Sequence, residues 1–154
     1  ASPDINGQDH VEFLFSANKN RPVQPVAQVA SGGEISRLML SLKSMMAGAT
    51  ALPTIIFDEI DTGTSGEIAD KMGDIMWRMG NNMQVLTISH LPQIAAKGAV
   101  HFHVYKQDTD DSSATYMKQL TKQERVDEIA RMLSGAETTE QAIANAKVML
   151  AGQI

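Results

Sequence analysis

The sequence has no cysteine, which excludes disulfide scaffolds, cysteine-ligated zinc sites and cysteine nucleophiles. It has no apolar run near the about 20 residues that a membrane-spanning helix needs, and no secretion signal is visible. Cations are also scarce, because 13 Lys and Arg stand against 18 Asp and Glu, for a net charge of -5. Such a chain lacks the dense cationic face of a self-sufficient binder of nucleic acid or anionic membrane. We therefore expect a cytoplasmic protein with no membrane partner.

What is present is typical of one globular unit. The chain has 154 residues, 43% of them hydrophobic, which suffices for one domain with a real core. The polar start, residues 1–9, is expected to be a disordered or boundary segment, and residues 10–154 to form one lobe.

Hydrophobic periodicity predicts an α/β fold. Strands are expected over residues 10–16, 53–58, 84–89, 100–105 and 114–120, and helices over 31–48, 66–80, 92–97, 121–135 and 138–150. The strand–helix–strand unit over 53–89 predicts two neighbouring parallel strands, and their apolar runs are typical of strands buried on both faces. The last two strands predict an antiparallel hairpin. The fold class is thus a mainly parallel sheet flanked by helices, plus a hairpin.

Two carboxylates follow the first of these parallel strands. Asp58 and Glu59 stand at its C-terminal end, the edge of an open α/β sheet at which ligands gather. An Asp there is suited to holding Mg²⁺ through water, and a Glu beside it to accepting a proton from an attacking water. Taken alone, the pair also fits a polar turn that ends a strand.

Two further constellations lie near helix or strand ends. Ser31, Gly32, Gly33 and Glu34 open a helix, where free backbone N–H groups and the helix dipole attract anions; the same residues also form a capping box. His90 follows the second parallel strand, so it is expected beside Asp58 and Glu59, within reach of a phosphate oxygen or a water. A structural histidine before Leu91-Pro92 is the plain alternative.

In order and spacing, these motifs resemble the C-terminal half of an ABC-type ATPase head. Ser31 to Glu34 match its signature motif, Ile55 to Glu59 its Walker B strand, Asp61 to Ser65 its D-loop and His90 its switch histidine. More narrowly, the stretches 29–37, 57–63 and 88–95 resemble the RecN family of bacterial DNA-repair ATPases, relatives of the SMC proteins. Two departures from transporters and other SMC proteins are Ile60, where transporters more often have Pro, and Ser65, where D-loops usually end in Asp.

The resemblance implies a composite ATP site. The sequence holds no G-x-x-x-x-G-K-S/T motif, which in the family lies in an N-terminal segment beyond a long coiled coil. On this interpretation Asp58 orders Mg²⁺, Glu59 activates water and His90 steadies the γ-phosphate. Ser31, Gly32, Gly33 and Glu34 bind the ATP of the opposite head in trans, next to Ser65 of the D-loop.

The implied partners are the N-terminal half of the same head, a second head in a homodimer, and DNA through the full-length protein. The implied function is ATP-dependent head dimerisation and ATP hydrolysis in double-strand break repair, near the bacterial nucleoid. This segment alone is expected to be inactive and to expose a sheet edge or apolar patch. The alternatives are a head fragment of another SMC or ABC-type ATPase, a non-catalytic dimerisation module, or a small metal-dependent hydrolase using Asp58, Glu59 and His90 by itself.

Overall fold

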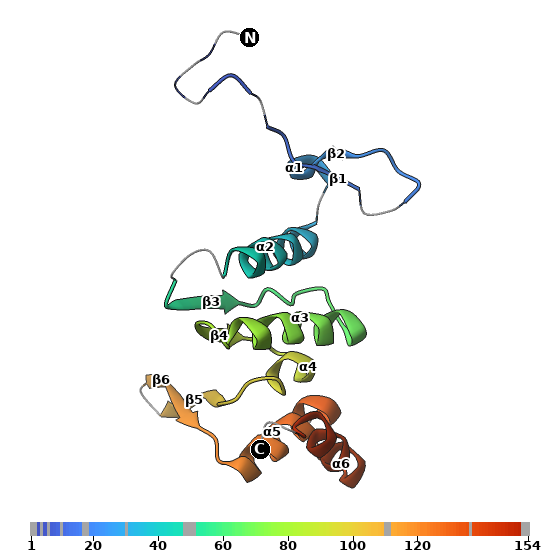
Figure 1. Ribbon diagram of the computed structural model, residues 1–154. Coiled ribbons are helices and arrows are strands. Elements are labelled where there is room, and N and C mark those ends of the chain that lie inside the picture. Colours follow the sequence, from blue (N-terminus) through green and yellow to red (C-terminus); the bar gives the residue numbers. More distant parts are fainter. Residues whose placement is uncertain are drawn as a thin grey trace.

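The computed structural model describes the chain except at residues 1, 2, 4, 6, 10, 17, 18, 30, 48–51, 110, 111, 136 and 152–154. Its fold is mixed α/β, as the sequence predicts, with a parallel strand pair, flanking helices and an antiparallel hairpin (Figure 1). The elements are β1 (Leu14–Phe15), β2 (Gln24–Pro25), α1 (Val26–Val29), α2 (Gly32–Met46), β3 (Thr54–Asp58), α3 (Gly66–Met79), β4 (Gln84–Ile88), α4 (Pro92–Ala95), β5 (Phe102–Thr109), β6 (Ser112–Gln119), α5 (Lys122–Ser134) and α6 (Glu140–Met149).

The N-terminal region departs most from the prediction. The strand expected over residues 10–16 is reduced to β1, which has two residues and pairs antiparallel with β2. Alternation alone does not extend it, because Val11 and Phe13 are exposed rather than packed on a core. Residues 18–25, whose two prolines predict a loop, include β2, and the four-residue helix α1 follows them.

The long helices begin where local capping chemistry predicts. Ser31 caps α2 and Thr121 caps α5, each with a Glu three residues on that completes a capping box. Helix α5 ends at Gly135, which has a positive φ of 79°. For α6 the predicted cap, Thr138, is one residue early, since the hydroxyl of Thr139 accepts the hydrogen bond from the Ala142 N–H. The predicted end of α2, Gly48, lies outside the described residues.

The parallel pair of β3 and β4 is confirmed, with Thr54 opposite Gln84 and Asp58 opposite Ile88. The prediction that these strands are buried on both faces is wrong. Phe57 is buried, whereas Ile56 and Ile88 on the other face are 64% and 55% exposed. Side chains alternate across a strand, so α2 and α3 cover only one face of this two-stranded sheet. Its uncovered face agrees with the exposed apolar patch expected from the sequence.

Methionines fill much of the first core cluster. The unbranched thioether side chains of α3 and the turn after it pack against α2, β3 and α4. The cluster comprises Leu40, Phe57, Ala69, Met72, Met76, Met79, Met83 and Ile94. Ile68, expected on the buried face of α3, is 49% exposed, because it lies at the margin of the arc that the methionines form.

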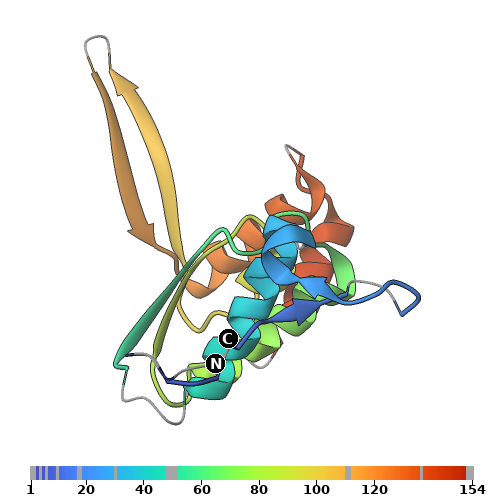
Figure 2. The same cartoon turned by 90° about the horizontal axis from the view of Figure 1, so that it is seen from above.

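A second core cluster forms between α5, α6 and Ala96. Helix α4 contacts both clusters, since Ile94 belongs to the first and Ala95 packs against the second. Its approach to α3 requires Gly73, where a Cβ would lie 2.9 Å from Cγ of Lys97. The Lys97 ammonium closes this contact with Asp74 and Asp70 at 2.7 and 3.0 Å. Beyond these helices the hairpin of β5 and β6 projects away (Figure 2).

Candidate functional site

The two predicted strand ends meet at one edge of the sheet. Because β3 and β4 are parallel neighbours in register, Asp58 and Ile88 stand side by side. The Glu59 N–H continues the ladder by donating to the Ile88 carbonyl oxygen over 3.1 Å. Glu59 therefore leaves β3 beside the point where Ser89 and His90 leave β4. Asp58, Glu59 and His90 are all exposed. Side chains that act on a ligand bound outside this lobe must be exposed.

Glu59 holds an unusual backbone conformation. Its φ is 46°, and it is the one non-glycine residue with positive φ among those described. A left-handed residue with a Cβ costs roughly 1–2 kcal/mol. The following turn maintains it, because Thr62 donates to the Glu59 carbonyl oxygen from its N–H at 3.3 Å and from its hydroxyl at 2.9 Å. Strain held in place in this way is often found at functional sites.

The turn that leads into α3 presents Ser65. Gly63 and Gly66 have φ values of 73° and 55°, a conformation that L side chains rarely adopt. Ser65 occupies the N-cap position of α3, yet its hydroxyl makes no capping hydrogen bond. The exposed hydroxyl is therefore available to a ligand or to a facing chain.

The start of α2 is held by its own capping box. The Ser31 N–H donates to Oε2 of Glu34 at 2.7 Å, and the Ser31 hydroxyl accepts from the Glu34 N–H at 3.4 Å. These bonds from Ser31 lower the pKa of the Glu34 carboxyl. Glu34 thus works as a cap. The Gly32 and Gly33 amides, unpaired by position in the first turn, make the anion-attracting end.

Gly33 brings this helix end close to the turn after β3. A Cβ at Gly33 would lie 3.0 Å from the Thr62 carbonyl oxygen and 3.3 Å from an Arg37 guanidinium nitrogen, whereas one at Gly32 would meet nothing within 4 Å. The structure therefore brings the start of α2 and the 59–65 turn together within one chain. The two glycines thus have different roles. Gly33 permits close contact with the turn after β3, whereas Gly32 leaves the helix start open to a ligand.

The sequence marks Asp61 only as the first residue of the D-loop match and gives Ser89 no role, and it predicts no contact between the two. Asp61 is 1% exposed, and the Ser89 hydroxyl donates to its Oδ2 over 2.5 Å. A polar residue two positions beyond the Asp-Glu pair, and a serine directly before His90, were the available signals. Neither reveals a contact across 28 residues of sequence.

The donor set at this edge fits a Mg²⁺ ion that is shared with a phosphate. Mg²⁺ is usually held by one or two carboxylates, with the rest of its shell from water and phosphate oxygens, and Asp58 offers one exposed carboxylate. Among the described residues, no group of three or more His, Asp or Glu gathers as a metal site.

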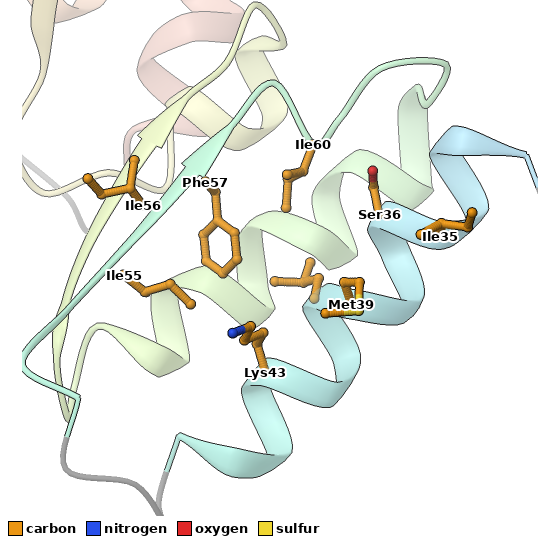
Figure 3. A pocket seen from close by; sticks show the side chains of 9 residues that line it. Ile35, Ser36, Met39, Lys43, Ile55, Ile56, Phe57 and Ile60 are labelled. Carbon is orange, nitrogen blue, oxygen red and sulfur yellow. The ribbon is translucent and has the colours of Figure 1, made fainter. Parts of the chain in front are cut away.

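Beside the site, an open groove runs between α2 and β3 (Figure 3). It has a volume of about 290 Å³, and its lining is apolar apart from Ser36 and Lys43. Met39, Lys43 and Phe57 point into the space between the helix and the strand, while Ile56 lies on the opposite side of β3 (Figure 3). This lining suits packing rather than catalysis.

Comparison with known proteins finds close relatives over nearly the whole chain. The chain is 44% identical over 145 residues to the DNA repair protein RecN of Halalkalibacterium halodurans, which covers 94% of the chain. It is 43% identical to RecN of Haemophilus influenzae and 40% identical to RecN of Bacillus subtilis. The predicted resemblance to RecN is confirmed. The chain spans only about a quarter of these RecN proteins, 26 to 27% of their length.

A solved structure is similar to the chain in fold. It comes from work on ATP-driven dimerization and DNA-stimulated activation of SMC ATPases. It matches with a TM-score of 0.53 and 12% identity, over 77% of this chain and 70% of that one. No protein-family model matches the chain. In the described part of the chain, no helix has the length and apolar character to cross a membrane.

Proposed function

We propose that this chain is the lobe of a RecN-like ATPase head that carries the catalytic carboxylates and the trans-acting signature. One observation carries the proposal: parallel pairing of β3 and β4 puts Asp58, Glu59 and His90 at one sheet edge, on a chain similar to RecN over nearly its whole length. The work proposed for the complete protein is ATP-dependent dimerisation of heads and ATP hydrolysis during DNA double-strand break repair, in the bacterial cytoplasm at the nucleoid.

Each residue has a chemical task in this proposal. ATP with Mg²⁺ supplies the phosphoryl group and the charge that holds it, in the complete head. Asp58 faces the metal, Glu59 accepts the proton of the attacking water, and His90 donates a hydrogen bond to the water or to a phosphate oxygen. The start of α2, with Ser31 and the glycine amides, closes on the nucleotide of the opposite head.

The remainder of the head is the proposed partner of the uncovered sheet face. The relatives are about four times longer than this chain, so the chain outside it is long enough to supply the nucleotide cradle and further strands. The exposed side chains of Ile56, Leu86 and Ile88 need an apolar cover, which such strands would bring. DNA is proposed as a partner of the full-length protein.

The decisive experiment measures ATP turnover by the full-length parent protein and by this segment alone. The segment alone is expected to show none. In the parent, Glu59→Gln is expected to lower kcat by about 100-fold or more, because the attacking water loses its base. Ser31→Arg is expected to abolish ATP-driven dimerisation, because it puts a bulky cation where the opposite nucleotide docks.

Matched controls are available on the far side of the lobe. Glu137→Gln and Ser134→Arg change exposed residues around the end of α5 and are expected to leave kcat and dimerisation unchanged. Unchanged turnover in Glu59→Gln would remove the proposed base. Turnover by the segment alone would favour the self-sufficient hydrolase. A parent that dimerises without hydrolysing ATP would favour the non-catalytic dimerisation module, which the exposed apolar face also suits.

A further inference from the structure

We propose that Asp61 and Ser89 form a positioning pair that fixes Glu59 and His90 relative to each other; this rests on the function proposed above. The Ser89 hydroxyl donates to Asp61 Oδ2 at 2.5 Å, and so joins the turn after β3 to the segment after β4. Asp61 is two residues beyond Glu59, and Ser89 directly precedes His90. The bond therefore links the backbone segments that carry the proposed base and the proposed switch histidine.

Each half of the pair also fixes its own backbone. The Ser89 hydroxyl accepts from the Leu91 N–H at 3.0 Å, so one oxygen bridges the residues on either side of His90. The Asp61 carbonyl oxygen accepts from the Thr64 N–H at 3.0 Å and from the Thr64 hydroxyl at 2.7 Å. The turn is thereby closed on itself, and Asp61 is its attachment to the neighbouring strand.

Together with the hydrogen bonds of the sheet, these bonds hold the backbone on both sides of Glu59. Its N–H donates to the Ile88 carbonyl oxygen at 3.1 Å, and its own carbonyl oxygen accepts from Thr62. The strained φ of 46° is thus held from both sides, and the Asp61–Ser89 bond keeps the two sides in register. Sites for phosphoryl transfer work mainly by positioning, so such a link is expected to affect rate more than binding.

A buried carboxyl group such as that of Asp61 is unfavourable in a turn whose role is purely structural. Its side chain is buried, and its Oδ1 has no hydrogen-bond partner among the described residues. A buried polar atom without a hydrogen-bond partner destabilises the folded chain, because its desolvation is not compensated. A residue kept at that cost, one turn from two strand ends that carry the site, is better explained by the geometry it imposes than by stability.

The test uses the full-length parent protein with Asp61→Asn, Ser89→Ala and the double variant, with Asp127→Asn and Ser134→Ala as matched controls on α5. The single variants are expected to lower kcat by about 10- to 100-fold with KM for ATP within about 2-fold, as a displacement of reacting groups does. The double variant is expected to be no worse than the more damaging single one, because all three act on the same bond: Asp61→Asn removes the charge of its acceptor, and Ser89→Ala removes its donor. Ser89→Thr keeps the hydroxyl and is expected to retain most of the wild-type kcat.

A second measurement does not depend on ATP. Hydrogen–deuterium exchange of the peptide that contains Leu91 is expected to be faster in Asp61→Asn and Ser89→Ala than in wild type and the controls, at unchanged overall unfolding temperature. Unchanged exchange and kcat in these variants, while Glu59→Gln abolishes turnover, would overturn the positioning pair and leave the proposed function intact. Loss of kcat only in proportion to loss of folded protein, or no rescue by Ser89→Thr, would also overturn it. A wild type without turnover would overturn the proposed function instead.

Discussion

Among the described residues, Glu59 is the one non-glycine residue whose backbone adopts a conformation that side chains disfavour. Its backbone is in the left-handed region, its neighbours hold it there with hydrogen bonds, and its side chain is exposed at the sheet edge. Glycine adopts this conformation without a steric penalty, whereas any residue with a Cβ does not. A glutamate at this position thus lowers the stability of the folded chain, and it fixes a carboxylate at the sheet edge.

Replacing Glu59 separates these two contributions. Glu59→Gly is expected to raise the free energy of unfolding above that of Glu59→Ala by about 0.5–1 kcal/mol, since only glycine relieves the strain. Denaturant unfolding of both variants measures the difference. The same pair at Glu137 serves as a reference for exposed sites outside the strained turn. If Glu59→Gly were less stable than Glu59→Ala by the same margin as the pair at Glu137, the backbone at Glu59 would be shown to be unstrained.

At this scale, the sequence predicts residues that act through their own position along the chain. Asp58, Glu59 and His90 can be predicted as candidates because each stands at the end of an apolar run that is typical of a strand. The contact between Asp61 and Ser89 cannot, because burial and pairing of a polar side chain arise only when two distant segments meet. The same holds for Gly33, whose need to be small comes from the Thr62 carbonyl oxygen.

At the scale of helices and strands, local chemistry predicts starts well and burial less well. Both capping boxes were predicted, since each depends on a side chain and a backbone group three residues apart. The cap of α6 was misplaced by one residue because Thr138 and Thr139 are chemically alike, and packing decides between them. The extended run over 10–16 failed because a strand needs a partner of equal length, and β2 provides only two residues.

The capping box of α5 predicts a dependence of stability on pH. The side-chain bond from Lys118 and the bonds from Thr121 lower the pKa of Glu124 from 4.5 to about 2. A carboxyl with a lowered pKa in the folded chain contributes its full stability above its ordinary pKa, and loses it as the pH falls toward 2. Glu124→Gln is therefore expected to be less stable than wild type at pH 7, with a gap that narrows between pH 4.5 and about 2.

Thermal unfolding of wild type and Glu124→Gln across this range measures the effect. Because Glu124 and Lys118 are largely accessible to solvent, added salt is expected to shrink the gap at neutral pH as well. Glu137→Gln, which removes an exposed carboxylate outside any helix, provides the reference. A gap that stays constant with pH would assign the effect to something other than this carboxylate.

Across the whole molecule, the most informative feature is a sheet with one face covered. The α/β class and the parallel crossover could be predicted because hydrophobic period and turn spacing encode them. The open face of β3 and β4 could be anticipated only from the missing P-loop, since their apolar runs read as strands buried on both sides. Under the proposed function, the apolar runs reflect the environment of the strands in the complete head, of which this chain would form one lobe.

This open face is expected to make the isolated chain self-associate and bind an apolar dye such as ANS. The double variant Ile56→Thr/Ile88→Thr keeps β-branched side chains in the strands while removing apolar surface. It is expected to reduce both properties with little loss of thermal stability, as measured by light scattering and dye fluorescence. Val148→Thr, at a site on α6 that is even more exposed, is the control. A wild-type chain that is a monodisperse monomer without dye binding would contradict the prediction.

The methionine-filled core has a consequence for oxidative damage. Met72, Met76, Met79 and Met83 are between 3% and 8% exposed, whereas Met45, Met46 and Met117 are more than half exposed. Peroxide converts an accessible thioether to a polar sulfoxide. The exposed methionines are therefore expected to be oxidised first. The buried methionines are those whose oxidation would disturb the core. Oxidation that stays on the surface leaves the strand ends in place, while a sulfoxide in the core would loosen the sheet that carries them.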